Sequence, residues 1–279
     1  MAVIKPSYSM DKIVKYFSKY KNITVKAGTY DITKTITVYS DCKVTCEPGV
    51  VFQRKFSGRM IEFNASSQIT GYNGTHNVQW TGGTFIASTN NTDQNVIVLY
   101  HCKDIELTNI VIDGCRGLHS LELNSSKNVK ITGCTFKNQS PKPDADFREA
   151  IQIDFAGKAG LSWHGAPDDA PSNDGTHCQQ IVIDNCTFDN CPCGVGTHSL
   201  SVPAIYHEDI TITNCKFSNI LHWGIKLLGM RNVTIKNCPT ANIIVNKKDE
   251  GHLLTGGKIK LPEGYRYNEN VIIDNIKIT

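Results

Sequence analysis

The sequence lacks strong charge and long apolar runs. Charged residues make up 20% of its 279 residues, the net charge is +3, and no basic run is longer than Lys247–Lys248. Nucleic-acid-binding surfaces need clustered Lys and Arg, so neither DNA nor RNA is expected as a partner. No apolar stretch approaches the roughly 20 residues of a membrane-spanning helix. The first residues, Met1–Pro6, do not resemble a signal peptide, so none is expected.

Helical periodicity is clearest in one short segment near the N-terminus. Residues 9–20 place Ile13, Val14, Tyr16 and Phe17 on one apolar face, and Ser9 is a suitable N-cap. We expect this helix to cap one open end of a larger β-structure, because the unpaired edge of a terminal strand must be covered.

What the sequence contains instead is a repeated segment of alternating apolar and polar residues, followed by a turn and an apolar anchor. The clearest copies are Lys127–Phe136, Gln179–Phe188 and Glu208–Phe217, and four weaker ones exist. Their first branched residues are separated by 27, 24, 52, 29, 23 and 38 positions and are Val78, Ile105, Val129, Ile181, Ile210, Val233 and Val271. Repeats of this length without helices predict a solenoid of stacked coils, each with three short strands.

Stacking the copies aligns two turn columns. One column contains Asn or Gly, which tolerate left-handed backbone, namely Gly82, Asn109, Gly133, Asn185, Asn214, Asn237 and Asn275. The next contains Cys134, Cys186, Cys215 and Cys238, which we expect to be reduced, buried and stacked. The alternative, a metal site of Cys191 and Cys193 with Cys186 and a histidine, lacks the usual zinc spacing. Neither a metal nor another cofactor is therefore expected.

With these columns, and with Ala27–Tyr30 opening the first coil, the chain resembles the pectate-lyase-like superfamily. The resemblance covers residues 23–279 and implies an all-β, single-stranded, right-handed parallel β-helix with an N-terminal capping helix. That superfamily includes pectate lyases, polygalacturonases and phage tail proteins that act on polysaccharides. We expect one domain over 1–279, with a cap at 1–22, coils at 23–241 interrupted by loops 138–148 and 155–178, and C-terminal coils at 242–279. The role of residues 242–268 is left open.

A second strand aligns in five coils and suggests where a site would lie. Alternation places Ile97, Leu121, Ile151, Val195 and Ile225 inside, and Val98, Glu122, Gln152, Gly196 and Lys226 outside. The next outward column contains Tyr100, Asn124, Asp154, His198 and Leu228, and the residues entering the strands are His119, Glu149, Cys193 and Trp223. Loops beside this strand would border the same outer face.

Carboxyl and imidazole side chains near this face suit proton transfer to or from a sugar. Cleavage of a glycosidic bond uses two carboxyl groups, and a histidine paired with one of them is oriented for proton transfer. The predicted catalytic residues are Asp154, His198, Glu149 and His177, with Asp154 and His198 within hydrogen-bonding reach. The predicted substrate-binding residues are Glu122, Gln152, Trp163, Asp174, Trp223 and Lys226. His119, His207 and His222 are expected in turns or at the surface.

The resemblance to polygalacturonases is partial. Of their four short motifs, Glu149 matches one acidic position and Lys226 the basic one, whereas the paired aspartates and the histidine between glycines are missing. The expected function is cleavage of a bacterial surface or extracellular polysaccharide by a glycoside hydrolase or lyase. The alternatives are a non-catalytic carbohydrate- or receptor-binding β-helix of a phage or prophage tail, and a structural trimer segment. The chain is also expected to form a homo-oligomer, such as a trimer. Its expected location is a virion or prophage particle, or the cytoplasm.

Overall fold

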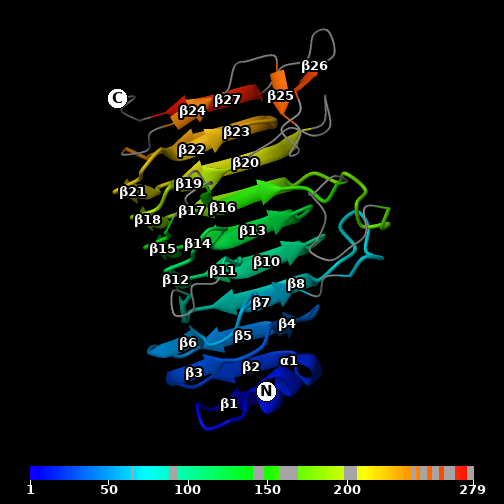
Figure 1. Ribbon diagram of the computed structural model, residues 1–279, viewed down its shortest axis with the longest axis vertical. Coiled ribbons are helices and arrows are strands. Elements are labelled where there is room, and N and C mark those ends of the chain that lie inside the picture. Colours follow the sequence, from blue (N-terminus) through cyan, green and yellow to red (C-terminus); the bar gives the residue numbers. More distant parts are fainter. Residues whose placement is uncertain are drawn as a thin grey trace.

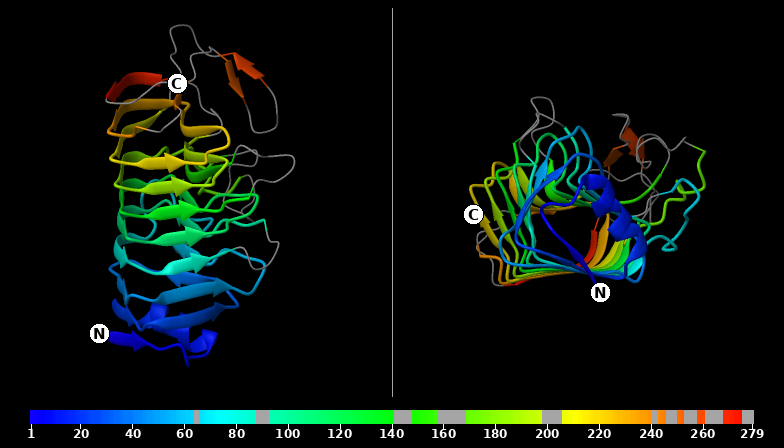
Figure 2. Two further views of the ribbon diagram at one scale, coloured as in Figure 1. Left: turned by 90° about the vertical axis from the view of Figure 1, so that its left-hand side faces the viewer. Right: turned by 90° about the horizontal axis from the view of Figure 1, so that it is seen from below.

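The three parallel sheets of the chain run along a common axis. The computed structural model describes residues 1–63, 66–87, 93–140, 148–157, 169–197, 206–239, 243–245, 250–252, 258–260 and 268–274. Successive coils stack into an elongated solenoid of roughly triangular cross-section, with the first and last strands of sheet A at opposite ends (Figures 1 and 2). All strand pairs within the three sheets are parallel, and neighbouring strands come from successive coils. This is the right-handed parallel β-helix that the sequence predicted.

Sheet A is formed by the repeated segments. Its ten strands, in spatial order, are β1 (Ala2–Ile4), β2 (Asn22–Val25), β5 (Lys43–Cys46), β8 (His76–Thr81), β11 (Lys103–Thr108), β14 (Lys127–Thr132), β17 (Gln179–Asp184), β20 (His207–Thr213), β23 (Met230–Lys236) and β27 (Asn268–Asp274). The seven branched residues used to align the repeats are all in register, from Val78 to Val271.

Sheets B and C complete each coil. Sheet B consists of β3 (Gly28–Ile32), β6 (Val50–Arg54), β9 (Thr84–Ile86), β12 (Val111–Asp113), β15 (Thr135–Lys137), β18 (Thr187–Asp189) and β21 (Lys216–Ser218). Sheet C consists of β4 (Ile36–Val38), β7 (Ile61–Phe63), β10 (Ile97–Tyr100), β13 (Leu121–Asn124), β16 (Glu149–Asp154), β19 (Cys193–Gly196), β22 (Trp223–Leu227) and β24 (Ile243–Val245). A separate antiparallel pair is formed by β25 (Glu250–His252) and β26 (Lys258–Lys260).

The N-terminal helix caps the solenoid as predicted. Helix α1 (Met10–Lys19) lies across the first coil (Figure 2), and the Ser9 hydroxyl accepts a hydrogen bond from Lys12 N at 3.4 Å. Its buried side chains are Ile13 and Phe17, and the Phe17 ring stacks on Trp80 with centroids 5.6 Å apart. No helix among the described residues is long and apolar enough to cross a membrane.

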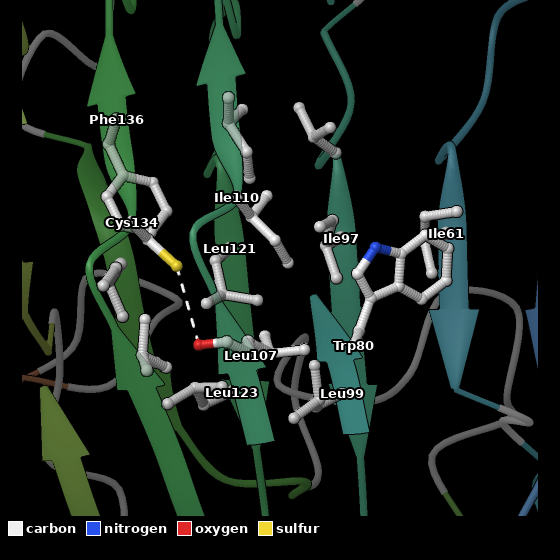
Figure 3. Packing of buried hydrophobic residues seen from close by; sticks show 14 of the residues in the cluster. Ile61, Trp80, Ile97, Leu99, Leu107, Ile110, Leu121, Leu123, Cys134 and Phe136 are labelled. Atoms are coloured by element: carbon white, nitrogen blue, oxygen red, sulfur yellow. Dashed lines mark hydrogen bonds between the residues drawn. The ribbon is translucent and has the colours of Figure 1, made fainter. Parts of the chain in front are cut away.

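Side chains of one kind occupy the same position in successive coils of the interior. All eleven cysteines are buried and free, and the burial predicted for the four ladder cysteines, Cys134, Cys186, Cys215 and Cys238, is confirmed. The Cys134 thiol donates to the carbonyl oxygen of Leu107 at 3.6 Å (Figure 3), and Cys186 donates to Ile131 O at 3.5 Å. Within the described part of the chain, no three His, Cys, Asp or Glu side chains are grouped as metal ligands.

Left-handed residues also stack, in the predicted turn column and in one that the sequence analysis missed. Asn214 and Asn237 of the predicted column have φ of 56° and 55°, and the Asn237 amide donates to Asn214 Oδ1 at 3.1 Å. The second column lies within sheet A and consists of Asn77, Asp104, Asn128, Gln180, Asp209, Asn232 and Asn270. Side-chain amides link many neighbours in it, such as Asn232 to Asp209 at 3.0 Å. The repeat therefore fixes backbone conformation as well as side-chain direction.

Candidate functional site

The outer face of sheet C differs from an ordinary solvated strand face. All six residues of β16 are buried, and so are all four of β10 and of β19. Strands β11, β14 and β17 of sheet A instead alternate between buried and more exposed positions. The polar side chains of β16 therefore lie in a low-dielectric setting, where each must be matched by a partner.

Two segments that are distant in sequence join at the carboxyl ends of the sheet C strands. Segments 66–74 and 169–177 lie side by side there (Figures 1 and 2), and Gly71 N donates to Asp174 Oδ2 at 2.6 Å. His101, fully buried just after β10, places one ring nitrogen 2.5 Å from Gly71 O and the other 2.8 Å from Ser172 O. We call this arrangement the loop clasp; it forms a fixed wall beside β16.

Glu149 lies at the start of β16 and is completely buried. Its Oε1 is 3.2 Å from Nζ of Lys226, which comes from β22, two strands away. The intervening residue in the outer column is Gly196, where a Cβ would lie 2.7 Å from Lys226 O and 3.4 Å from Glu149 Cγ. The missing side chain at Gly196 thus leaves the space in which the lysine reaches the carboxylate. Glu149 and Lys226, which alone matched the polygalacturonase motifs, form an ion pair.

His119 stands beside this ion pair. His119 was expected in a turn or at the surface. It does lie outside the strands, just before β13, but it is buried. Its Nδ1 lies 2.8 Å from Glu149 O and 3.7 Å from Glu149 Oε2. Burial lowers the pKa of His119 more than nearby Glu149 and Glu122 raise it, so the ring is held neutral. The site therefore contains a histidine that was not among the predicted site residues, although its alignment with Glu149 was a usable signal.

Asp154 ends β16 and is 5% exposed, so it is not the surface residue that the outward alternation suggested. Its Oδ2 accepts from Gln152 Nε2 at 3.2 Å and its Oδ1 from Phe155 N at 2.8 Å. Desolvation, with smaller effects of Glu122 and Glu149, raises the pKa of Asp154 well above its usual range. The carboxyl group of Asp154 thus retains its proton at pH values at which an exposed aspartic acid has lost it.

The other predicted binding residues form parts of the same surroundings. Glu122 is half-buried in β13, in register with Gln152, and its two oxygens accept from the side-chain amides of Asn95 and Asn124. Trp223 begins β22, with its ring centroid 5.8 Å from Lys226 Nζ. Glu122, Gln152, Asp154 and Glu149 therefore come together on β13 and β16, with Lys226 and Trp223 on β22.

His177 and Asp174 belong to the loop clasp. Asp174 is exposed and accepts from Gly71 N and Thr176 N, so its carboxylate organises the segment's backbone. His177 is buried and stacks on Phe155, with ring centroids 4.3 Å apart, and burial lowers its pKa to about 4. His177 borders Asp154 through Phe155, the residue that follows Asp154 in the chain. His198 and Trp163 lie outside the described residues, so the Asp154–His198 pair stays a prediction.

No family model matches the chain. A curated relative, the plasmin and fibronectin-binding protein A of Streptococcus pneumoniae, is 21% identical over 235 residues, covering 77% of this chain and 32% of the relative. The chain thus spans about a third of the curated relative that it matches.

Several solved structures share the architecture. The crystal structure of PfbA, a surface adhesin of Streptococcus pneumoniae, has a TM-score of 0.71 at 17% identity, covering 96% of this chain and 69% of that one. A tailspike protein of E. coli bacteriophage HK620, in complex with a pentasaccharide, has a TM-score of 0.55 at 11% identity, with coverages of 98% and 48%. The family 28 exopolygalacturonase of Yersinia enterocolitica has a TM-score of 0.53 at 10% identity, with coverages of 99% and 66%. At these identities the likeness establishes the parallel β-helix fold.

Proposed function

We propose that the chain is a polysaccharide-active protein that cleaves a bacterial surface or extracellular glycan on the outer face of sheet C. One observation carries the proposal: β16 holds two carboxyl groups in opposite environments. Burial raises the pKa of Asp154 well above its usual range, whereas Glu149 Oε1 lies 3.2 Å from the Lys226 ammonium group. Two titratable groups whose surroundings separate their protonation states are the usual arrangement of an acid and a base in one site.

The roles follow from these states. Asp154 donates its proton to the glycosidic oxygen, because a neutral carboxylic acid is the donor that such cleavage requires. Glu149, or Glu122 beside it, acts as the carboxylate that stabilises or attacks the positive sugar carbon. Trp223 offers a ring face for stacking of a sugar. The fold that this chain shares with an exopolygalacturonase and a pentasaccharide-bound tailspike supports a glycan as the substrate class.

The test is turnover on a panel of bacterial capsular, wall and extracellular polysaccharides. Products are scored as new reducing ends, which report hydrolysis, and as absorbance of unsaturated sugars, which reports lyase chemistry. We expect Asp154→Asn to lower turnover by about 100- to 10,000-fold, because it removes the proton donor while keeping a neutral side chain of the same shape. Glu106→Gln, which changes a carboxyl group on sheet A, is the matched control and is expected to leave turnover unchanged. Full activity of Asp154→Asn disproves the assignment.

A second candidate is glycan or receptor binding without cleavage. It is favoured by the likeness to a streptococcal surface adhesin and by the near-complete burial of Asp154 and Glu149. Retention of a glycan on the immobilised protein, with neither product formed over the whole panel, is the outcome that selects this function over cleavage.

A further inference from the structure

A second hollow lies on sheet A, beside the 66–74 segment of the loop clasp. Its volume is about 500 Å³, and its lining includes Tyr72, Asn73, Lys103, Lys127, Asn128 and Gln180. The two lysines begin β11 and β14, while Tyr72 comes from the clasp. A volume of this size accommodates a few sugar units.

The hollow is lined by two lysines and one carboxylate, that of Asp104, so its lining carries a net positive charge. Lys103 and Lys127 are paired in register, and their outer neighbours in that column are His76 and Gln179. Neither lysine forms an ion pair with any residue that the structure describes.

Further along the same column, Arg231 lies between Glu208 and Glu269 and pairs with both. Like charges on adjacent strands repel one another, so the two unpaired lysines favour an anion between them.

The aromatic wall of the hollow is fixed in position. The Tyr72 hydroxyl donates to His177 O at 2.7 Å, and Lys127 Nζ lies 5.6 Å from the centroid of its ring. Burial raises the pKa of Tyr72 to about 12, so the phenol stays neutral and keeps this bond. Hydrogen bonds of the loop clasp, such as that from Gly71 N to Asp174 Oδ2, hold the segment that carries the ring.

Amide side chains and one carboxylate form the rest of the lining. Asn128 Nδ2 donates to Asp104 Oδ1 at 2.6 Å, so the one carboxylate of the lining is engaged by an amide. Gln180 and Asn73 are exposed side chains of the lining, and Asn73 Nδ2 also donates to Thr70 O at 3.0 Å. Amide groups of this kind suit the hydroxyls of a sugar, which both donate and accept.

We propose that this hollow binds an acidic saccharide, at a site separate from the carboxyl groups of sheet C. Lys103 and Lys127 contact a carboxylate or sulfate of the glycan, the Tyr72 ring packs against the apolar face of a sugar, and the amides bind hydroxyls. This binding does not depend on whether the chain cleaves a glycan, since none of these residues belongs to the proposed cleavage site.

The experiment is calorimetric titration of the full chain with hexasaccharide probes. Oligogalacturonate presents carboxylates, a heparin hexasaccharide presents sulfates as well, and maltohexaose is the neutral probe. We expect at least one acidic probe to bind with an affinity that falls as salt is added, and maltohexaose not to bind. The double variant Lys103→Gln/Lys127→Gln should lose about tenfold or more in affinity, because two charge-assisted contacts disappear.

The controls separate this site from charge in general. The variant Lys130→Gln/Lys137→Gln has the same net charge as Lys103→Gln/Lys127→Gln, but it removes lysines that are already paired with Glu106 and Asp113. Its affinity should therefore stay within about twofold of that of the unaltered chain. Tyr72→Leu should weaken binding with both lysines present. Absence of binding to both acidic probes, equal losses in the two double variants, or equal binding of inorganic polyphosphate overturns the proposal.

Discussion

Sheets A and C are built from the same coils, yet their outer faces follow different physical rules. On sheet A, outward charges form exposed pairs such as Lys130 with Glu106, whose side chains are 54% and 45% exposed. On sheet C, Glu149 is fully buried and its partner Lys226 is 16% exposed. Exposed pairs contribute little to stability, whereas breaking a buried pair leaves a charge without solvent. The outer face of sheet A is therefore tolerant to change, and that of sheet C is constrained.

The largest expected effect comes from breaking the buried pair. Lys226→Met should lower the free energy of unfolding by about 3–5 kcal/mol, because Glu149 loses its counter-charge. Lys130→Met, the matched change on sheet A, should stay within about 0.5 kcal/mol. Chemical denaturation measures both, and Glu149→Gln added to Lys226→Met should restore part of the loss. Equal effects of the two single variants would remove the distinction between the sheets.

The next effect is an acid sensitivity located at the loop clasp. Unfolded histidine titrates near pH 6.5, while His177 in the folded protein has a pKa of about 4. Between these two pH values, His177 binds a proton in the unfolded state but not in the folded state. Stability is thus fully present above pH 6.5 and falls by about 3 kcal/mol as the pH falls to 4. His177→Phe, which keeps a ring against Phe155, should abolish this part of the pH dependence in denaturation curves recorded across the range.

Asp154 gives a dependence of the opposite sign. Its folded pKa is raised, so above about pH 4 the unfolded state releases a proton that the folded state retains. This stability is complete below pH 4 and declines by up to about 1.4 kcal/mol per pH unit until the folded pKa is reached. Asp154→Asn should flatten that decline without unfolding the protein. An unchanged slope in the variant would show that the carboxyl is ionised and would weaken its role as proton donor.

The smallest expected effect concerns the interior, which both sheets share. Substitutions there should have the same effect near either sheet. Cys186, beneath the turn after sheet A, and Cys178, beneath the turn after sheet C, are both buried free thiols. Cys186→Ala and Cys178→Ala should each cost about 1 kcal/mol, since each removes one well-packed sulfur atom. Mass spectrometry of alkylated native protein should find neither a disulfide nor a modified ladder thiol.

The register was predictable from sequence because each coil gives a position the same surroundings. One branched residue per copy, from Val78 to Val271, sufficed to align sheet A, and Ser9 was enough to place the start of α1. The left-handed column within sheet A was equally visible in the sequence, since Asp or Asn precedes the branched residue in six of the seven copies.

The character of the site was predictable only in part. The alternation of apolar and polar residues placed Gln152 and Lys226 on the outer face correctly. It describes one strand at a time, however, and does not indicate whether other segments bury that face. Asp154 is followed by Phe155, whose ring stacks on His177 of the 169–177 segment, and a pattern read along one strand does not express such a contact. The Glu149–Lys226 contact depends on the absent side chain of Gly196, a relation across three coils that no single repeat expresses.

The loop clasp changes how the solenoid should come apart. In a stack of coils, each coil contacts only its neighbours, so loss of structure spreads one coil at a time from an open end. The clasp instead joins residues 103 and 105 positions apart, through Gly71 with Asp174 and Tyr72 with His177. The coils between β8 and β17 are thereby closed into one cooperative block that must open together. Amide exchange should show a shared high protection there, with lower, graded protection in the strands towards β23.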